Sequence, residues 1–228
     1  MGWKRGSVIM EAKPYAHVIC QKYAEDRCNF CLKSSSNLKK CGTCKNIRYC
    51  SIVCQKGDWR IHKTECPIMK RVPNVPTDSI RLYLRLVLLY LDHRSSLKDP
   101  KAEAPCIRSF DDLMSRRENI KTDKKRAELF QIATDFLRAY THGLLQLPSD
   151  ETLLDIFGKM VINTFTVANE MLQDVAVAIY TSPSVLNHRC RPNAVASFDG
   201  RRVVIRAVED IPSGSLSDVS LTLEFKDL

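Results

Sequence analysis

The stretch 28-CNFCLKSSSNLKKCGTCKNIRYCSIVCQKGDWRIHKTEC-66 decides how this chain folds. It contains four pairs of soft N/S ligands, two of the form Cys-x2-Cys, one Cys-x3-Cys and one His-x3-Cys. Eight such ligands match two tetrahedral zinc sites, so we expect two zinc ions as cofactors. The segment has too few apolar residues to fold around a core alone, and zinc would supply its folding energy. The ligands are Cys28, Cys31, Cys41, Cys44, Cys50, Cys54, His62 and Cys66.

The spacing within each pair predicts its local structure. A Cys-x2-Cys pair on a tight turn directs two thiolates at one metal. In a Cys-x3-Cys or His-x3-Cys pair, successive turns of a helix do the same, because residues i and i+4 share a face. Spacing alone leaves open which pairs share a metal. Free buried cysteines are the alternative, and this density and regularity argue against them.

Composition narrows the class of protein. The chain has 228 residues, 44% of them hydrophobic, which is enough for one large domain or two small ones. The most apolar run, at 82–91, is interrupted by Arg85 and is too short to span a membrane. The N-terminus lacks the pattern of a signal peptide, so we expect a cytosolic or nuclear protein whose cysteines stay reduced.

The positive charge of the chain is concentrated in the ligand-rich stretch. The net charge is +9, and residues 28–66 hold eight Lys or Arg against two acidic residues. Such a surface attracts acidic peptides or nucleic acid. Because few aromatic residues accompany the basic ones, we favour protein partners. We expect Tyr49 and Trp59 to form a small core rather than to anchor a partner.

The remaining sequence predicts the α+β class. Short strands are expected at 7–20, then a Pro-rich linker at 70–78 and a helix at 80–92 capped by Thr77 or Asp78. Residues 94–105 are predicted to form a loop. A long helix is predicted at 111–143, another begins at Ser149 or Asp150, and strands with a hairpin turn at 198–202 follow Phe165. The long helix carries an apolar stripe that we expect to lie in the core: Leu113, Ile120, Ala127, Leu129, Phe130, Ala133, Phe136 and Leu137.

The ligand-rich stretch resembles a MYND zinc finger over its full length. The ending Tyr-Cys-x3-Cys-Gln-x2-Asp-Trp-x2-His-x3-Cys is matched at every position from Tyr49 to Cys66. MYND fingers are protein-interaction modules that typically bind proline-containing peptides. The resemblance implies an interleaved arrangement, with Cys28, Cys31, Cys50 and Cys54 on one zinc and Cys41, Cys44, His62 and Cys66 on the other.

The C-terminal part resembles a SET domain. The stretch 186-LNHRCRPN-193 is similar to the Asn-His-Ser-Cys-x-Pro-Asn signature, and 161-VINTFTV-167 and 201-RRVVIRAVEDIPSG-214 resemble its neighbouring segments. Together with the finger, this identifies the chain as a member of the SET-and-MYND-domain family. The resemblance implies a split β-rich SET domain with an inserted finger and a helical insertion. Its parts would be 1–27 (first SET part), 28–66 (finger), 67–155 (linker and helices) and 156–228 (SET core).

The resemblance also implies an activity. Members of this family are protein-lysine methyltransferases that use S-adenosylmethionine, act on histones or other proteins, and occur in cytoplasm and nucleus. By carry-over, Asn187, His188 and Asn163 would contact the cofactor. Phe165 would line the channel through which the target lysine enters.

Three departures from the family pattern define the alternative. The Gly-x-Gly segment and the post-SET cysteines are not found, and Leu221 stands where the spacing predicts the catalytic tyrosine. We therefore assign no catalytic residue, and we expect a chain that is incomplete at both ends. Two functions follow: a lysine methyltransferase, or a catalytically silent, zinc-dependent scaffold or transcriptional co-regulator.

Overall fold

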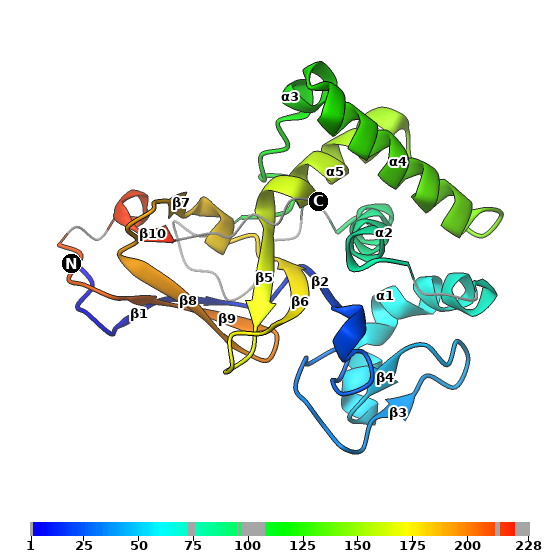
Figure 1. The fold of residues 1–228 in the computed structure, drawn as a ribbon, viewed down its shortest axis with the longest axis horizontal. Helices are drawn as coiled ribbons and strands as arrows, with labels where there is room; N and C mark the ends of the chain where they lie inside the picture. The colour runs from blue at the N-terminus through cyan, green and yellow to red at the C-terminus, as the bar shows by residue number, and fades with distance from the viewer. Residues whose placement is uncertain (1, 73–75, 95, 97–107, 213–214, 222–228) are drawn as a thin grey trace.

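Strands from the two ends of the chain build its sheets together (Figure 1). The structure is a computed structural model that describes residues 2–72, 76–94, 96, 108–212 and 215–221. One three-stranded antiparallel sheet has the order β1-β9-β8, and a second has the order β2-β6-β5. The bounds are β1 Val8–Ala12, β2 Ala16–Ile19, β5 Thr164–Ala168, β6 Asp174–Ile179, β8 Ala194–Asp199 and β9 Arg202–Ala207.

This pairing makes everything between the two sets of strands an insertion. Ala12 faces Val203 across β1 and β9, and Ala16 faces Ile179 across β2 and β6. The α+β class and the split arrangement expected from the sequence are confirmed. The hairpin between β8 and β9 turns at Gly200, whose φ of 57° lies in the left-handed region that favours glycine.

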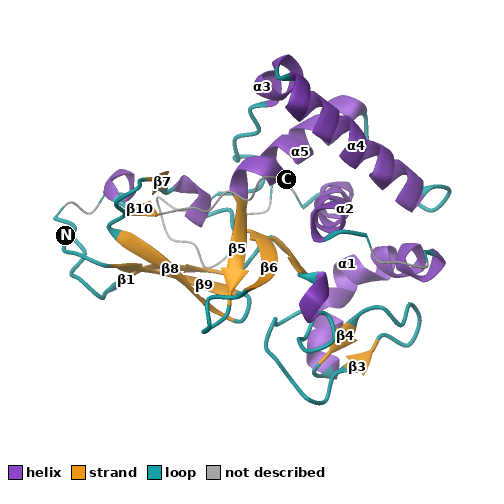
Figure 2. Cartoon of the chain, in the orientation of Figure 1, coloured by secondary structure: helices purple, strands orange, loops and turns teal. Residues whose placement is uncertain are grey.

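The helices gather on one side of the sheets (Figure 2). The finger and α1 lie at one end of this layer, and α2 lies between α1 and the pair formed by α4 and α5 (Figure 1). Nine residues of α2 are buried, which fits its position in the centre. The helices are α1 Ile52–Arg71, α2 Asp78–Leu91, α3 Arg117–Thr122, α4 Lys124–Thr141 and α5 Asp150–Asn163.

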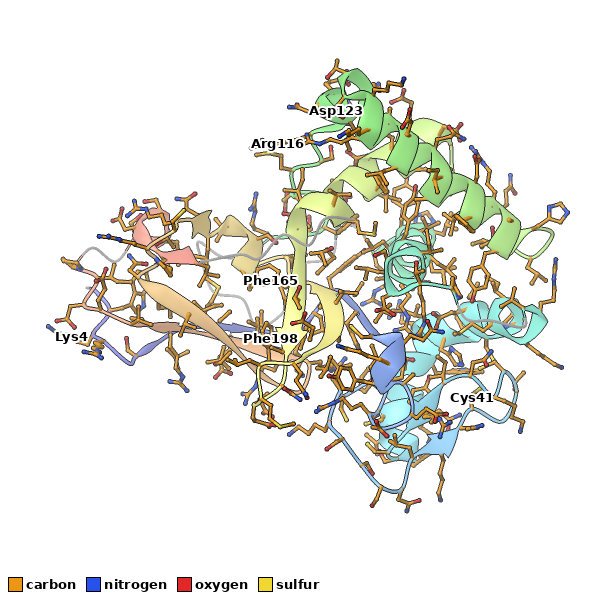
Figure 3. The ribbon with its side chains drawn as sticks, in the orientation of Figure 1. Lys4, Cys41, Arg116, Asp123, Phe165 and Phe198 are labelled. Carbon is orange, nitrogen blue, oxygen red and sulfur yellow. The ribbon has the colours of Figure 1, made fainter. Side chains whose placement is uncertain are left out.

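Helix starts follow local capping chemistry. Ser149 caps α5 by accepting a hydrogen bond from the amide of Thr152, as the sequence indicated. Thr77 stands directly before α2, as expected, but its side chain makes no capping hydrogen bond, and the helix begins at Asp78. The predicted helix at 111–143 is wrong in its first part. Arg116 has a left-handed φ of 47°, the short α3 follows it, and the chain breaks again at Asp123. The Asp123 side chain accepts from the amide of Arg126 and so starts α4 as a separate helix (Figure 3).

Part of the predicted apolar stripe on this helix is also wrong. Leu113, Ile120, Ala133 and Leu137 are buried, but Leu129 and Phe136 are exposed. These exposed side chains help to line a cavity of about 470 Å³ between the start of α2, α4, α5 and the β5–β6 pair. The periodicity predicted the correct helix but could not show that no other element covers this part of it within the described residues.

The apolar core has two parts that meet at β5 and β6. One lies among the helices and the finger, and the other lies between the two sheets. Alternation along β5 separates them, because successive side chains point to opposite faces. Phe165 and Val167 belong to the core between the sheets, whereas Thr164 and Thr166 face the 470 Å³ cavity. The predicted loop at 94–105 falls mostly outside the described residues.

Candidate functional site

Two clusters of soft ligands lie in the finger. The first cluster consists of Cys28, Cys31, Cys50 and Cys54, whose sulfur atoms lie within 4.8 Å of one another. Cys50 Sγ is 3.7 Å from Cys31 Sγ and 3.5 Å from Cys54 Sγ. Three of the four residues are partly exposed, so this cluster lies close to the surface.

The second cluster is buried at all four positions. It consists of Cys41, Cys44, His62 and Cys66, again with ligand atoms within 4.8 Å. The Sγ atoms of Cys41 and Cys66 are 3.8 Å apart, and Cys44 Sγ is 3.6 Å from His62 Nε2. The grouping matches the interleaved arrangement that the resemblance implied.

These separations test whether zinc fits. With Zn–S bonds of about 2.3 Å, the edge of a tetrahedron between two sulfur atoms is roughly 3.8 Å, and an edge to a histidine nitrogen is roughly 3.6 Å. The separations of 3.5 to 3.8 Å are close to those edges. The first cluster offers four thiols, and the second offers three thiols and an imidazole. Both clusters therefore fit zinc by donor type and by spacing.

Helix α1 holds ligands of both clusters. His62 and Cys66 are four residues apart on the helix and share a face, as predicted. The prediction for Cys50 and Cys54 is wrong in detail, because the helix begins at Ile52 and Cys50 precedes it. Ser51 caps the helix by accepting from the amide of Cys54, and this cap fixes the turn that brings the two thiols together.

A buried ionic network surrounds the second cluster. His62 Nδ1 lies 3.1 Å from Glu65 Oε2, and Glu65 also accepts from Arg81 Nε at 2.7 Å and Arg85 Nη2 at 2.8 Å. Arg85 donates in addition to both carboxylate oxygens of Asp58. All of these side chains are buried. Charge compensation is therefore essential, since an unpaired buried charge costs several kcal/mol.

The network changes the pKa values of its members. Burial alone would raise the pKa of Glu65, but Arg81 and Arg85 hold it well below its usual range. Burial would likewise raise the pKa of Asp58, and Arg85 outweighs it and lowers that pKa. Both carboxylates are thus ionised in the folded chain.

Different contacts surround the first cluster. The ring of Phe30 lies between α1 and the β8–β9 hairpin. On one side a Cβ at Gly57 would come within 2.4 Å of the ring, so only glycine fits there. On the other side the guanidinium of Arg201 stacks 3.6 Å from the ring centroid. An exposed ion pair between Lys33 and Asp199, at 2.9 Å, accompanies this contact.

The aromatic residues of the finger have different roles. Tyr49 is buried and donates a hydrogen bond to Asp58 at 2.7 Å, as expected for a small core. Trp59 is 45% exposed, so the prediction that it belongs to that core is wrong. Ile52 and Val53, at the start of α1, are also exposed, and apolar side chains therefore lie on the basic surface of the finger.

The SET-like motif forms a crossover near the C-terminal end of the described chain. Strand β7 (Asn187–His188) pairs in parallel with β10 (Ser220–Leu221). The Asn187 amide donates to the carbonyl of Ser217 at 2.9 Å. Asn193 binds the same segment through the carbonyl of Asp218 and the amide of Ser220. The two asparagines thus hold the last segment beside the motif.

The other predicted site residues lie where α5 ends. Asn163 is the last residue of α5 and donates to the carbonyls of Lys159 and Met114. Phe165, labelled in Figure 3, is buried. Its ring meets that of Tyr180 edge-on, with the ring centroids 5.4 Å apart. Leu221 is buried in the core between the sheets, with its backbone opposite that of His188. Among the described residues, no hydrogen bond or ring contact joins Asn163 or Phe165 to Asn187.

Sequence reasoning missed the residues that surround the second cluster. Glu65, Arg81 and Arg85 were not singled out as partners of the zinc ligands. A signal was present, because Arg81 and Arg85 are four residues apart in an otherwise apolar helix. Two arginines on one face of a buried helix require acidic partners, and the finger holds only Asp58 and Glu65.

Comparison with known proteins agrees with this geometry. Residues 28–66 match the MYND finger family. Histone-lysine N-methyltransferase SMYD3 is 33% identical in Mus musculus and 34% in Homo sapiens, over 226 residues that cover 98% of this chain and 50% of the relative. N-lysine methyltransferase SMYD2 of Bos taurus is 28% identical over 211 residues, covering 92% of this chain and 47% of the relative.

The fold and the two clusters define a MYND zinc-finger protein in which the finger is inserted between strands of one α+β structure. The chain belongs to the SMYD family, that is, the SET-and-MYND-domain family. It spans about half the length of the curated relatives that it matches. Within the described residues, none of the helices has the length and apolar character needed to cross a membrane.

Proposed function

We propose that the protein is an S-adenosylmethionine-dependent protein-lysine methyltransferase acting on histones or other proteins in cytoplasm and nucleus. The crossover carries the proposal. The parallel pairing of β7 with β10, together with the hydrogen bonds from Asn187 and Asn193 to the segment 217–218, supports the proposal, because the family resemblance implies an Asn-His pair beside a crossing segment of the chain. Its relatives named above are lysine methyltransferases, which supports the same activity.

Asn187, Asn163 and Phe165 lie in surroundings that suit their predicted tasks. The cofactor supplies the methyl group. The amide nitrogens of Asn187 and Asn163 already donate to main-chain carbonyls, which fixes both side chains. The amide oxygen of the exposed Asn187 can then accept from an ammonium group. Phe165 and Tyr180, packed edge-on, would form a rigid wall that excludes water from the lysine channel.

Calorimetric titration with S-adenosylmethionine tests the proposal. We expect measurable binding that Asn187→Ala weakens. Asn193→Ala is the matched control. This substitution also removes a side-chain hydrogen bond to the segment 217–220, but Asn193 has no proposed contact with the cofactor. Absence of binding heat at millimolar cofactor would rule out methyl transfer by this chain. Methyl incorporation into histone lysines then measures activity.

One observation favours a second candidate, a catalytically silent scaffold. Leu221 occupies the position that the resemblance assigns to a tyrosine, and its side chain is buried in the core. An aliphatic side chain offers no hydroxyl to the lysine amine. Cofactor binding with methyl incorporation at background level would select the scaffold, whereas clear turnover would exclude it.

The finger is proposed to bind partner proteins in either case, because MYND fingers are interaction modules. The exposed Trp59, Ile52 and Val53 on a basic surface suit a proline-containing peptide with acidic residues. Trp59→Ala should reduce affinity for such a peptide, and Phe136→Ala, an exposed aromatic change on α4, should not. Tighter binding of DNA than of any peptide, with a steep salt dependence, would favour nucleic acid instead.

A further inference from the structure

Glu65 lies at the point where the second cluster meets the rest of the fold. It is fully buried, with 0% of its side chain exposed. Oε2 lies 3.1 Å from His62 Nδ1 and 2.8 Å from Arg85 Nη2, and Oε1 accepts from Arg81 at 2.7 Å. One carboxylate therefore joins a metal ligand to two side chains of α2.

The charges around Glu65 determine how His62 is used. The carboxylates of Asp58 and Glu65 balance the guanidiniums of Arg81 and Arg85 within the buried network. A neutral imidazole then carries its proton on Nδ1, which donates to Glu65. Nε2 keeps its lone pair and faces Cys44 Sγ at 3.6 Å, inside the second cluster. Such a carboxylate fixes both the tautomer and the ring orientation of a metal-binding histidine.

The arginines of this network come from outside the finger. Arg81 and Arg85 lie four residues apart on α2, which also packs against β2. Arg85 donates to the main-chain carbonyl of His17 in β2 at 3.2 Å. The chain of contacts thus runs from a zinc ligand through Glu65 to a helix and a strand of the main fold.

We propose that Glu65 is a positioning residue for the second zinc site and couples zinc retention at that site to the packing of α2. His62 would bind zinc through Nε2, it contacts Glu65 through Nδ1, and Glu65 pairs with the two arginines of α2. Because such coupling is reciprocal, loosening α2 weakens zinc binding, and loss of zinc loosens α2. The finger is then one unit with the rest of the fold rather than a separable module. The proposal does not depend on methyltransferase activity.

Glu65→Gln in the full chain tests the proposal. The amide keeps an acceptor oxygen for His62 but removes the charge that binds the arginines. In a titration with a chromogenic chelator, we expect one of two zinc ions to be released at roughly 10–100-fold lower chelator concentration. Cobalt substitution assigns the loss, because a site of four thiolates and a site of three thiolates and an imidazole differ in their d–d absorption bands. The bands of the second cluster should shift while those of the first cluster stay unchanged.

Asp58→Asn is the matched control. It also removes a buried carboxylate bound to Arg85, but Asp58 contacts no zinc ligand in the described hydrogen bonds. It should lower thermal stability and leave the cobalt spectrum and the order of zinc release unchanged.

Either of two outcomes overturns the proposal. Wild-type zinc retention in Glu65→Gln is one, and equal loosening of zinc in Asp58→Asn is the other. If Glu65→Gln does not fold, Arg81→Lys replaces it, because it keeps the charge but loses the paired bonds to Glu65. Weaker zinc binding at the second cluster then supports the proposal, and unchanged retention refutes it.

Discussion

The two zinc clusters of the finger have similar ligand spacing but different surroundings. The second cluster is buried at every ligand and enclosed by charged side chains from α2. The first cluster lies near the surface, and its neighbour Phe30 stacks on Arg201 of the β8–β9 hairpin. Buried ion pairs connect the second cluster to the rest of the fold, whereas ring stacking and an exposed ion pair connect the first cluster. Equivalent ligand changes should therefore have unequal consequences.

Loss of a ligand should give the largest difference. Cys44→Ser removes a thiolate from the second cluster, and we expect the finger to unfold, zinc content to fall below one ion per chain, and peptide binding to be lost. Cys54→Ser changes the partly exposed first cluster and should leave a folded α1 with about one zinc. Metal analysis and circular dichroism measure both. Equal losses of zinc and of helical structure in the two variants would show that the clusters contribute equally to folding.

Removal of the central arginine should come next. Arg85→Met leaves Asp58 and Glu65 buried without their shared partner, which should reduce the free energy of unfolding by about 3–5 kcal/mol. Arg60→Met is the control, since Arg60 pairs with Asp92 at an exposed site, and should cost less than about 1 kcal/mol. Urea unfolding compares them. If Arg85→Met reduced the free energy of unfolding as little as the control does, the buried network would contribute nothing to stability.

Acid should destabilise the contact between β2 and the finger. His17 Nε2 donates to the carbonyl of Asn29, and burial, with Arg85 nearby, lowers the pKa of His17 from 6.5 to about 4. This contribution is present above pH 6.5 and is lost as pH falls toward 4, by roughly 3 kcal/mol. His17→Gln should unfold with a flatter pH dependence in urea at matched zinc content. If the pH dependence of unfolding were the same in His17→Gln and the wild type, His17 would not be the group responsible for it.

The hairpin contact should give the smallest effect. Gly200→Ala places a Cβ 2.4 Å from the carbonyl oxygen of Cys31 at a φ of 57°, which should cost roughly 1–2 kcal/mol and speed zinc release from the first cluster. Gly42→Ala, in open space beside the second cluster, should change neither the stability of the chain nor the rate of zinc release. Thermal melting and chelator kinetics measure the pair. If Gly200→Ala released zinc as slowly as the wild type does, the hairpin would have no influence on zinc retention at the first cluster.

The finger could be predicted in detail because its chemistry is local. Ligand type and spacing indicated both clusters, and the resemblance supplied their pairing. The helix start at Ser149 also followed from short-range capping. The break at Asp123 did not, because an aspartate in a helical pattern is indistinguishable from an ordinary surface residue until its cap bond to Arg126 is seen.

Non-local relations were beyond the sequence. The exposure of Leu129 and Phe136 depends on which other elements reach α4. Tyr49 and Trp59 were both assigned to a small core, but only Tyr49 is buried there. The roles of Asn187, His188, Asn163 and Phe165 remain predictions, since they concern a cofactor and a substrate rather than the packing of the chain itself.

The pairing of β1 with β9 and β2 with β6 has a consequence for how the chain folds. The partners are about 160–200 residues apart, so these sheets have high contact order and form slowly. The zinc ligands lie within some forty residues, and Arg81 and Arg85 follow soon after them, so the finger and α2 can assemble early during synthesis. The edge of β2 stays unpaired until β6 leaves the ribosome, and the edge of β1 stays unpaired until β9 does. The newly made chain is therefore exposed to aggregation until these strands emerge, with the finger and α2 already in place.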